Sequence, residues 1–152
     1  MSEKLYLLGH PIAHSKSPAM YNAVYEQLGL PWRYELADLA TEEEARAFLE
    51  ARGFLSVNIT TPYKPHAFEV TTHRAASAKL ARGANLLVKH GEALIAYNTD
   101  GQGCVAYLER TEFVFAGATV VVCGTGPTAL AILHACAVAA VSYTHLSSAE
   151  GK

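Results

Sequence analysis

The stretch Ala118–Ala129 reads ATVVVCGTGPTA, and it sets the expected fold class. A β-branched run leads into a glycine-rich turn, and an almost wholly apolar stretch follows the turn. This order is typical of a strand–turn–helix unit that binds a dinucleotide. In such a unit Gly124 permits a tight turn, Gly126 lets the backbone approach a pyrophosphate, and Ala129 lets the helix pack closely on the strand. An ordinary glycine-rich turn is the alternative, because the acidic or arginine residue expected about 20 positions further on is absent around Thr144–Leu146.

Upstream of Ala118, segments of strand and helix character alternate along the chain. Apolar or alternating runs predict strands over these ranges: Leu5–Leu8, Trp32–Leu36, Leu55–Ile59, Leu86–Val88 and Ala93–Tyr97. Helical segments are expected after Pro18, after Thr41, after Lys64, over Ala75–Ala81 and over Gly101–Glu109. The short turn at His90-Gly91 requires the last strand pair to be antiparallel. The alternation predicts an α/β fold with a mostly parallel sheet.

Two of the predicted helices carry more specific signals. Met20, Val24 and Leu28 recur at i, i+4 and i+8, and this spacing gives the first helix an apolar face. Thr41 and Glu44 form a T-x-x-E capping box, which predicts where the second helix begins.

The composition excludes several classes of protein. The chain has 152 residues, 51% of them hydrophobic, and a formal net charge of −2, so it can bury a sizeable core and is not expected to be disordered. The near-neutral charge provides no basic face for a nucleic acid or an anionic membrane. No window reaches the ~18 consecutive apolar residues of a membrane-spanning helix, and Met1–Lys4 leads into a strand without a signal peptide. The three cysteines lie far apart and are odd in number, which indicates reduced thiols and a cytoplasmic protein.

The loop Gly9–Pro18 reads GHPIAHSKSP and carries two candidate ligand-binding serines. Ser15 and Ser17, spaced i and i+2, could place two hydroxyls on one anion, such as a carboxylate, beside a helix N-terminus. The alternative, which composition alone favours, is that Ser17 caps the helix. His10 and His14 lie in the same loop, but the loop is not helical and offers no third ligand, so no metal site is expected.

Two further polar motifs follow predicted strands, at the sheet edge where α/β proteins bind ligands. Asn58–Lys64 reads NITTPYK, and its lysine is either an acid or base in a partly desolvated site or a solvated surface residue. Asn98–Gly101 reads NTDG. Asp100 either caps the helix that follows or accepts a hydrogen bond from a substrate hydroxyl and holds a lysine in position.

Together these motifs resemble those of the shikimate dehydrogenases. The family patterns are G-x-P-I-x-H-S-x-S-P with a helix asparagine after it, N-[VI]-T-x-P-x-K, N-T-D-G-x-G and a glycine turn. They occur in this order at Gly9–Pro18 with Asn22, Asn58–Lys64, Asn98–Gly103 and Gly124–Ala129. The resemblance covers about Leu5–Ala140. It implies a three-layer αβα substrate-binding domain over residues 1–102 and the first βα unit of a truncated Rossmann domain over residues 103–140. The implied reaction is the NADPH-dependent reduction of 3-dehydroshikimate to shikimate.

The resemblance also implies roles for individual residues. Lys64 and Asp100 would form the catalytic pair, since a lysine beside a carboxylate can stabilise and protonate the alkoxide that hydride transfer leaves. Ser15 and Ser17 would bind the substrate carboxylate. The ring hydroxyls and the reacting oxygen would be bound by Asn58, Thr60, Asn85 and Asp100. The cofactor NADP would be bound by Gly124, Thr125, Gly126, Pro127, Thr128 and Ala129.

The chain departs from the family pattern in two regions. Asn85 is followed by Leu86 where threonine is usual, and Arg82 stands where glycine is common. Residues 141–152 do not resemble the family's next strand, so we expect a truncated chain with a non-native tail. Two alternatives stay open: a non-catalytic shikimate-binding module, and a relative that uses quinate and NAD. The apolar helix over Leu130–Ala140 predicts a homodimer or other self-association.

Overall fold

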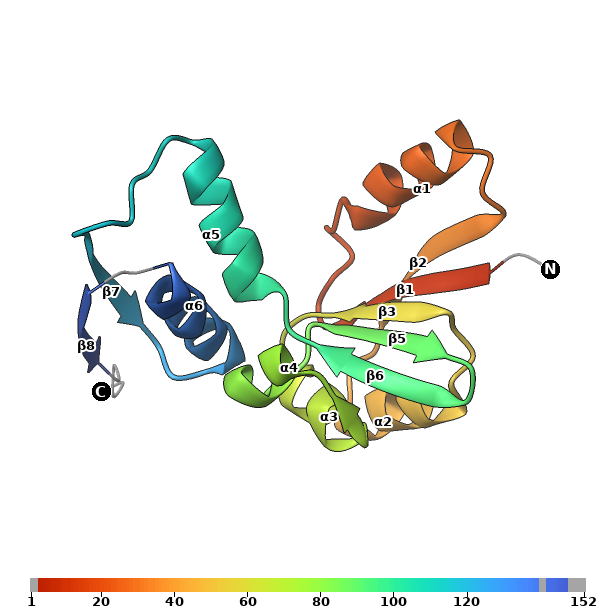
Figure 1. Ribbon diagram of the computed structural model, residues 1–152. Coiled ribbons are helices and arrows are strands. Elements are labelled where there is room, and N and C mark those ends of the chain that lie inside the picture. The colour runs from red at the N-terminus through yellow and green to blue at the C-terminus, as the bar shows by residue number, and fades with distance from the viewer. Residues whose placement is uncertain (1–2, 140–141, 148–152) are drawn as a thin grey trace.

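The computed structural model describes residues 3–139 and 142–147 of the chain (Figure 1). The strands are β1 (Glu3–Gly9), β2 (Trp32–Asp38), β3 (Ser56–Ile59), β4 (His73–Arg74), β5 (Leu86–His90), β6 (Ala93–Tyr97), β7 (Thr119–Cys123) and β8 (Ser142–Ser147). The helices are α1 (Ser17–Gln27), α2 (Glu42–Ala51), α3 (Lys64–Glu69), α4 (Ala76–Ala81), α5 (Asp100–Arg110) and α6 (Pro127–Val138). The alternation of strands and helices confirms the predicted α/β class.

Six strands form one mixed sheet in the order β2-β1-β3-β5-β6-β4. The pairs β1–β2, β1–β3 and β4–β6 are parallel, and the pairs β3–β5 and β5–β6 are antiparallel. The predicted antiparallel pair is therefore confirmed. Its turn contains Gly91 with a φ of 59°, a left-handed conformation that glycine adopts without steric cost.

Helices cover both faces of this sheet, with α1 on one side and α2 and α3 on the other (Figure 1). The larger core lies on the α2–α3 side and includes the buried side chains of Leu8, Leu49, Val57, Tyr63 and Leu87. Side chains alternate along each strand, so the neighbours of Leu8 and Val57 point to the α1 side. Asn58, one of the candidate binding residues, lies on that second face.

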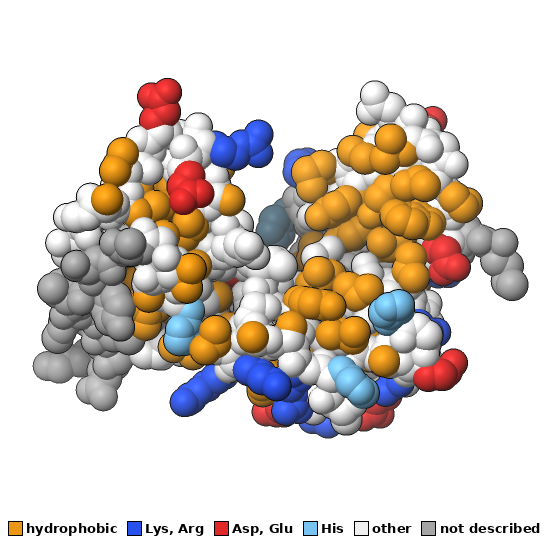
Figure 2. All heavy atoms as spheres, viewed as in Figure 1, with side chains coloured by type: hydrophobic (Ala, Val, Ile, Leu, Met, Phe, Trp, Pro, Cys, Tyr) orange, Lys and Arg blue, Asp and Glu red, His pale blue; other side chains and the backbone are white. Residues whose placement is uncertain are grey.

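The face of α1 that packs on the sheet differs from the one that the apolar spacing indicates. Met20, Val24 and Leu28 are exposed, and hydrophobic side chains gather on the surface over α1 and the adjoining sheet (Figure 2). Tyr21 and Tyr25 face the sheet instead, in a cluster with residues of β1 and β2. Tyrosine rings carry more contact area than methionine or valine side chains, and this contact decides the orientation of the helix.

The second region, from α5 to β8, has a much smaller core. Phe115 and Cys136 are buried in it, while Val121 and Val138 are 63% and 88% exposed. β8 pairs in parallel with β7, with an irregular register near Val120. Self-association through the exposed apolar groups stays a prediction.

The predicted domain boundary between residues 102 and 103 lies within α5, which begins at Asp100. Part of the predicted atypical tail, residues 142–147, forms β8 beside β7. Residues 141 and 148–152 lie outside the described residues, and the origin of the tail stays a prediction. Within the described ranges, no helix combines the length and apolar character that a bilayer crossing requires.

Candidate active site

Lys64 begins α3, directly after the end of β3 and the turn at Pro62. Its Nζ donates hydrogen bonds to Asp100 Oδ2 at 2.5 Å and to Thr128 Oγ1 at 2.8 Å. The side chains of Lys64 and Asp100 are only 16% and 21% exposed. The interpretation of Lys64 as a solvated surface lysine is therefore wrong.

Asp100 is the first residue of α5, and its carboxylate is held from several directions. Asn85 Nδ2 donates to Oδ1 at 2.7 Å, and the Thr128 hydroxyl donates to Oδ2 at 3.1 Å. The helix is preceded by Thr99, and no side chain caps it, so the interpretation of Asp100 as an N-cap is wrong. The carboxylate instead lies beside the ammonium group of Lys64. The structure thus brings the two predicted catalytic residues together.

Asn85 is oriented by its contacts with Thr99 as well as with Asp100. Its Oδ1 accepts the Thr99 N–H at 2.9 Å, and its Nδ2 donates to Thr99 Oγ1 at 3.0 Å. Arg82, three residues before Asn85, has a φ of 51°. Because this left-handed conformation suits glycine best, the backbone accounts for the glycine that is common there in the family.

Asn98 holds the backbone beside Asn85 and Asp100 in place, a role that the sequence did not indicate. Its side chain is buried and donates to the Gly83 carbonyl at 3.0 Å. Its Oδ1 accepts the Asp100 N–H at 3.1 Å. The asparagine of the NTDG motif therefore fixes the start of α5, and with it the position of the Asp100 carboxylate.

The two loop serines also lie together. The Ser15 hydroxyl donates to Ser17 Oγ at 3.2 Å, and the Ser17 N–H donates to Ser15 Oγ at 3.3 Å. Ser17 is the first residue of α1, the cap position is Lys16, and no side-chain cap bond forms, so the interpretation of Ser17 as a helix cap is wrong. Both serines line a hollow, the serine hollow, whose wall also includes His10, Ile12, Thr60 and Thr61.

Asp38, at the end of β2, anchors the loop that carries these serines. Its Oδ1 lies 2.8 Å from His10 Nδ1, and its Oδ2 accepts the Ile12 N–H at 3.1 Å. The Ile12 carbonyl in turn accepts the Ser15 N–H. The hydrogen bond from His10, followed by the one from Ile12, lowers the pKa of the Asp38 carboxyl. The sequence offered no signal for this residue, because its partners lie in a separate loop.

Asn58 lies in β3, and Thr60 is the first residue after that strand. Asn58 Oδ1 accepts a hydrogen bond from the Tyr34 hydroxyl at 2.9 Å. Thr60 lines the serine hollow, and its methyl group would overlap a Cβ at position 9, so Gly9 allows this close approach. The end of β3 and the residue after it thus contribute two of the candidate binding side chains, a few residues before Lys64.

Lys64 lines a second cavity of about 900 Å³, together with residues of α5, β7 and α6. Thr61 lines both this cavity and the serine hollow. Of the predicted substrate residues, Ser15, Ser17 and Thr60 line the serine hollow, while the predicted catalytic residue Lys64 lines the adjoining cavity.

The glycine turn lies on the wall of the second cavity and fits a pyrophosphate group. Gly124 has a φ of 129°, a conformation that L side chains rarely adopt. Gly126 is the N-cap of α6 without a side-chain cap, so the N–H groups of the first turn, at Thr128 and Ala129, have no partner within the helix. A helix N-terminus of this kind attracts anions. Pro127 occupies the first helical position and fills the space beside Gly83.

Thr128 was predicted to bind the cofactor, and its hydroxyl has a further position that the sequence did not indicate. That hydroxyl lies between Lys64 and Asp100, with hydrogen bonds to both. Thr125 lies in the turn between the two glycines. In the described part of the chain, no group of three or more His, Cys, Asp or Glu side chains could hold a metal ion.

Comparison with known proteins shows the family of the chain. Residues 7–87, more than half of the chain, match the family model of the shikimate dehydrogenase substrate binding domain. Shikimate dehydrogenase (NADP(+)) of Symbiobacterium thermophilum is 40% identical over 133 residues, which cover 86% of this chain and 45% of that protein. The enzyme of the same name from Bartonella quintana is 37% identical over 135 residues, covering 87% and 46%.

A solved structure agrees with this family. Shikimate 5-dehydrogenase from Thermus thermophilus, in complex with NADP(H) and shikimate, superposes with a TM-score of 0.84 at 30% identity. The match covers 93% of this chain and 54% of that one. The chain spans about half the length of the curated relatives that it matches. By its matched residues, its sheet and its motifs, the chain belongs to the family of the shikimate dehydrogenase substrate binding domain.

Proposed function

We propose that the chain forms the substrate-binding part of an NADP-dependent shikimate dehydrogenase, which reduces 3-dehydroshikimate to shikimate. One observation carries the proposal: Lys64 and Asp100, half-enclosed between α3, α5 and α6, form an ion pair that Asn85 and Thr128 hold in place. Names of the curated relatives support the same activity.

In this proposal the two ends of the substrate are bound by different loops. Ser15 and Ser17 bind the carboxylate, because paired hydroxyls beside the N-terminus of α1 suit an anion. Asn58, Thr60 and Asn85 bind the ring hydroxyls. Thr61 lines both the serine hollow and the cavity that Lys64 lines, so a ring acid with its carboxylate in the hollow can extend toward Lys64.

The chemistry assigned to the ion pair is proton transfer. NADPH, when bound, supplies the hydride that reduces the ring ketone, and the carbonyl oxygen then needs a proton. Lys64 Nζ holds that proton and, as a cation, stabilises the negative charge that develops on the oxygen. Asp100 orients the ammonium group and accepts a hydrogen bond from a substrate hydroxyl.

The cofactor's pyrophosphate is assigned to the glycine turn, from Gly124 to Ala129. The N–H groups at the start of α6 suit this anion, and the turn lies against the cavity that Lys64 also lines. A dinucleotide held at this turn would therefore face the same cavity as Lys64.

Calorimetry with shikimate tests the binding half of the proposal. We expect the 152-residue chain to bind shikimate and Ser15→Ala to weaken that binding, because one of the two hydroxyls on the carboxylate is lost. Ser56→Ala, on β3 and outside the serine loop, is the matched control and should bind as the wild type does. Absence of shikimate binding by the wild type would overturn the proposal.

A second candidate is a non-catalytic shikimate-binding module, since the family model that matches the chain, over residues 7–87, is that of the substrate binding domain. Oxidation of NADPH in the presence of 3-dehydroshikimate separates the two candidates. If the protein oxidises NADPH in this assay, Lys64→Ala should lower the rate of NADPH oxidation by about 100-fold or more, while the affinity for shikimate changes little. An unchanged rate in that variant would remove the lysine from the mechanism.

A further inference from the structure

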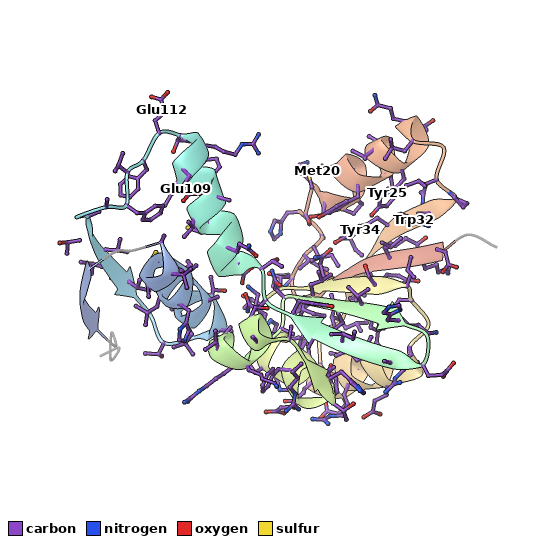
Figure 3. All side chains as sticks on the ribbon, in the orientation of Figure 1. Met20, Tyr25, Trp32, Tyr34, Glu109 and Glu112 are labelled. Atoms are coloured by element: carbon purple, nitrogen blue, oxygen red, sulfur yellow. The ribbon has the colours of Figure 1, made fainter. Side chains whose placement is uncertain are left out.

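Tyr34 of β2 contacts both α1 and Asn58, one of the residues proposed to bind the substrate. Its side chain is buried between α1 and the sheet (Figure 3) and is 2% exposed. The ring stacks on Tyr21 of α1, with the ring centroids 4.6 Å apart and an interplanar angle of 18°. The hydroxyl extends beyond this stack and donates to Asn58 Oδ1 at 2.9 Å.

The strand register explains why a tyrosine reaches Asn58 from two strands away. Leu5 of β1 pairs with Tyr34 on one side, and Leu7 pairs with Asn58 on the other. Tyr34 and Asn58 thus project from the same face of the sheet, offset by two residues along β1. A phenol is long enough to cross β1 diagonally and reach the amide. A phenylalanine ring would occupy the same space without the oxygen.

The backbone of Tyr34 is itself fixed by Asn22 of α1. Asn22 Oδ1 accepts the Tyr34 N–H at 2.8 Å, and Asn22 Nδ2 donates to the Tyr34 carbonyl at 2.9 Å. β2 is an edge strand, so these two backbone groups have no further strand to pair with. The side chain of Asn22 takes that place. Both the backbone and the ring of Tyr34 are therefore held before any ligand binds.

The contact at Asn58 decides which end of the amide is presented to a ligand. When Oδ1 accepts the phenol proton, Nδ2 becomes the end that can face a ligand, and it makes no hydrogen bond to the described residues. A phenol is a good donor, and burial raises the pKa of the Tyr34 hydroxyl, so the proton stays in place at neutral pH. Asn58 then offers an N–H donor, which suits a substrate oxygen.

We infer that Tyr34 is a positioning residue for substrate binding: its hydroxyl fixes the Asn58 amide with Nδ2 available as a donor to a ring oxygen. The inference rests on the proposed function for the identity of the ligand. In this inference the contacts of Tyr34 with Asn22 and Asn58 orient one hydrogen-bond donor, Asn58 Nδ2. The tyrosine ring supplies the packing between α1 and the sheet, and the hydroxyl supplies the orientation.

Tyr34→Phe is the direct test, since it removes one oxygen and keeps the ring. We expect the dissociation constant for shikimate, measured by calorimetry on the 152-residue chain, to rise about tenfold. Tyr25→Phe is the matched control, because Tyr25 belongs to the same aromatic cluster and its hydroxyl makes no hydrogen bond within the described residues. This control should bind shikimate as the wild type does.

A double-mutant cycle with Asn58→Ala separates positioning from packing. If Tyr34 acts through Asn58, Tyr34→Phe should have no further effect on the dissociation constant in the Asn58→Ala background. Additive effects of the two changes, or an unchanged affinity in Tyr34→Phe alone, would overturn the inference while leaving the proposed function intact.

A spectroscopic measurement tests the same contact without a ligand. The Asn58 side-chain amide signals, assigned from their loss in Asn58→Ala, should shift in the nitrogen–proton NMR spectrum of Tyr34→Phe and stay in place in Tyr25→Phe. Unmoved signals in Tyr34→Phe would contradict the inference. If the wild type does not bind shikimate, the proposed function fails and this spectrum still decides whether Tyr34 orients Asn58.

Discussion

The six-stranded sheet and the α5–β8 region bury their apolar side chains to very different extents. The core between the sheet and α2–α3 contains fourteen buried residues, whereas the α5–β8 core is built on Phe115 and Cys136. In the second region even valines, such as Val121 and Val138, are largely exposed. Since apolar burial is the main favourable contribution to folding, the sheet holds most of the stability of the described chain.

The candidate active site nevertheless draws on both regions. Lys64 belongs to the well-packed sheet region, and Thr128 belongs to α6 in the other. Asp100 begins α5, the first element of the second region. The side of the site that carries the residues proposed to bind substrate is thus well packed, whereas the side that carries the glycine turn has a smaller core.

The largest effect is expected from a cavity in the sheet core. Leu49 of α2 is 1% exposed, and Leu49→Ala should lower the free energy of unfolding by about 2–5 kcal/mol, because it removes buried contacts and leaves a void. Urea denaturation measures this loss. Val121→Ala in β7 is the control, and its effect should stay within about 0.5 kcal/mol because the side chain is exposed. Equal losses in the two variants would contradict the difference in packing between the regions.

Local signals in the sequence predicted much of this fold. The capping box of Thr41 and Glu44 forms as predicted at the start of α2, and the antiparallel β5–β6 pair follows from a turn too short for any other connection. Such features depend on residues a few positions apart, so their physics is contained in the sequence itself.

Features that depend on distant partners were predicted less well. The packing face of α1 is decided by Tyr21 against Tyr34, and Tyr34 arrives from another strand. Ser17 and Asp100 were each open to interpretation as a helix cap, yet their contacts lie elsewhere. Lys64 is 36 residues from Asp100 and 64 residues from Thr128, so spacing alone could not show that the three side chains meet.

A smaller effect is expected where α5 meets α6. A Cβ added at Gly101 would overlap the backbone carbonyl of Ala131 in α6, and backbone atoms cannot easily move aside. Gly101→Ala should therefore push the two helices apart and cost about 1–3 kcal/mol. Amide hydrogen exchange should show faster exchange in α6 and unchanged exchange in β1 and β3.

Gly103→Ala provides the control on the same helix. Its added Cβ meets no atom within 4 Å, and alanine favours a helix over glycine by about 1 kcal/mol. This variant should be as stable as the wild type or more stable. If α6 exchanges no faster in Gly101→Ala than in Gly103→Ala, the close approach of α5 and α6 does not hold the second region in place.

The smallest effect concerns the charge that anchors the serine loop. Hydrogen bonds from His10 and Ile12 lower the pKa of Asp38 below its ordinary value of 3.8. A carboxyl whose pKa is lower in the folded state contributes stability above its unfolded pKa, and that contribution is lost as the pH falls through the folded pKa. Asp38→Asn lacks this titration, so its melting temperature should lie below that of the wild type at about pH 6, and the gap should narrow as the pH approaches about 3.

Glu35→Gln, which removes the same charge from the same strand, separates this anchor from a general charge effect. Glu35 makes no hydrogen bond through its carboxylate to the described residues, so at about pH 6 Glu35→Gln should lower the melting temperature less than Asp38→Asn does. The Asp38 carboxylate holds the Ile12 N–H, and the Ile12 carbonyl holds the Ser15 N–H, so the loss of the anchor should also reach the serines. Shikimate affinity near neutral pH should then fall in Asp38→Asn and not in Glu35→Gln. Equal affinity in both variants would mean that the serine loop keeps its shape through its backbone contacts alone.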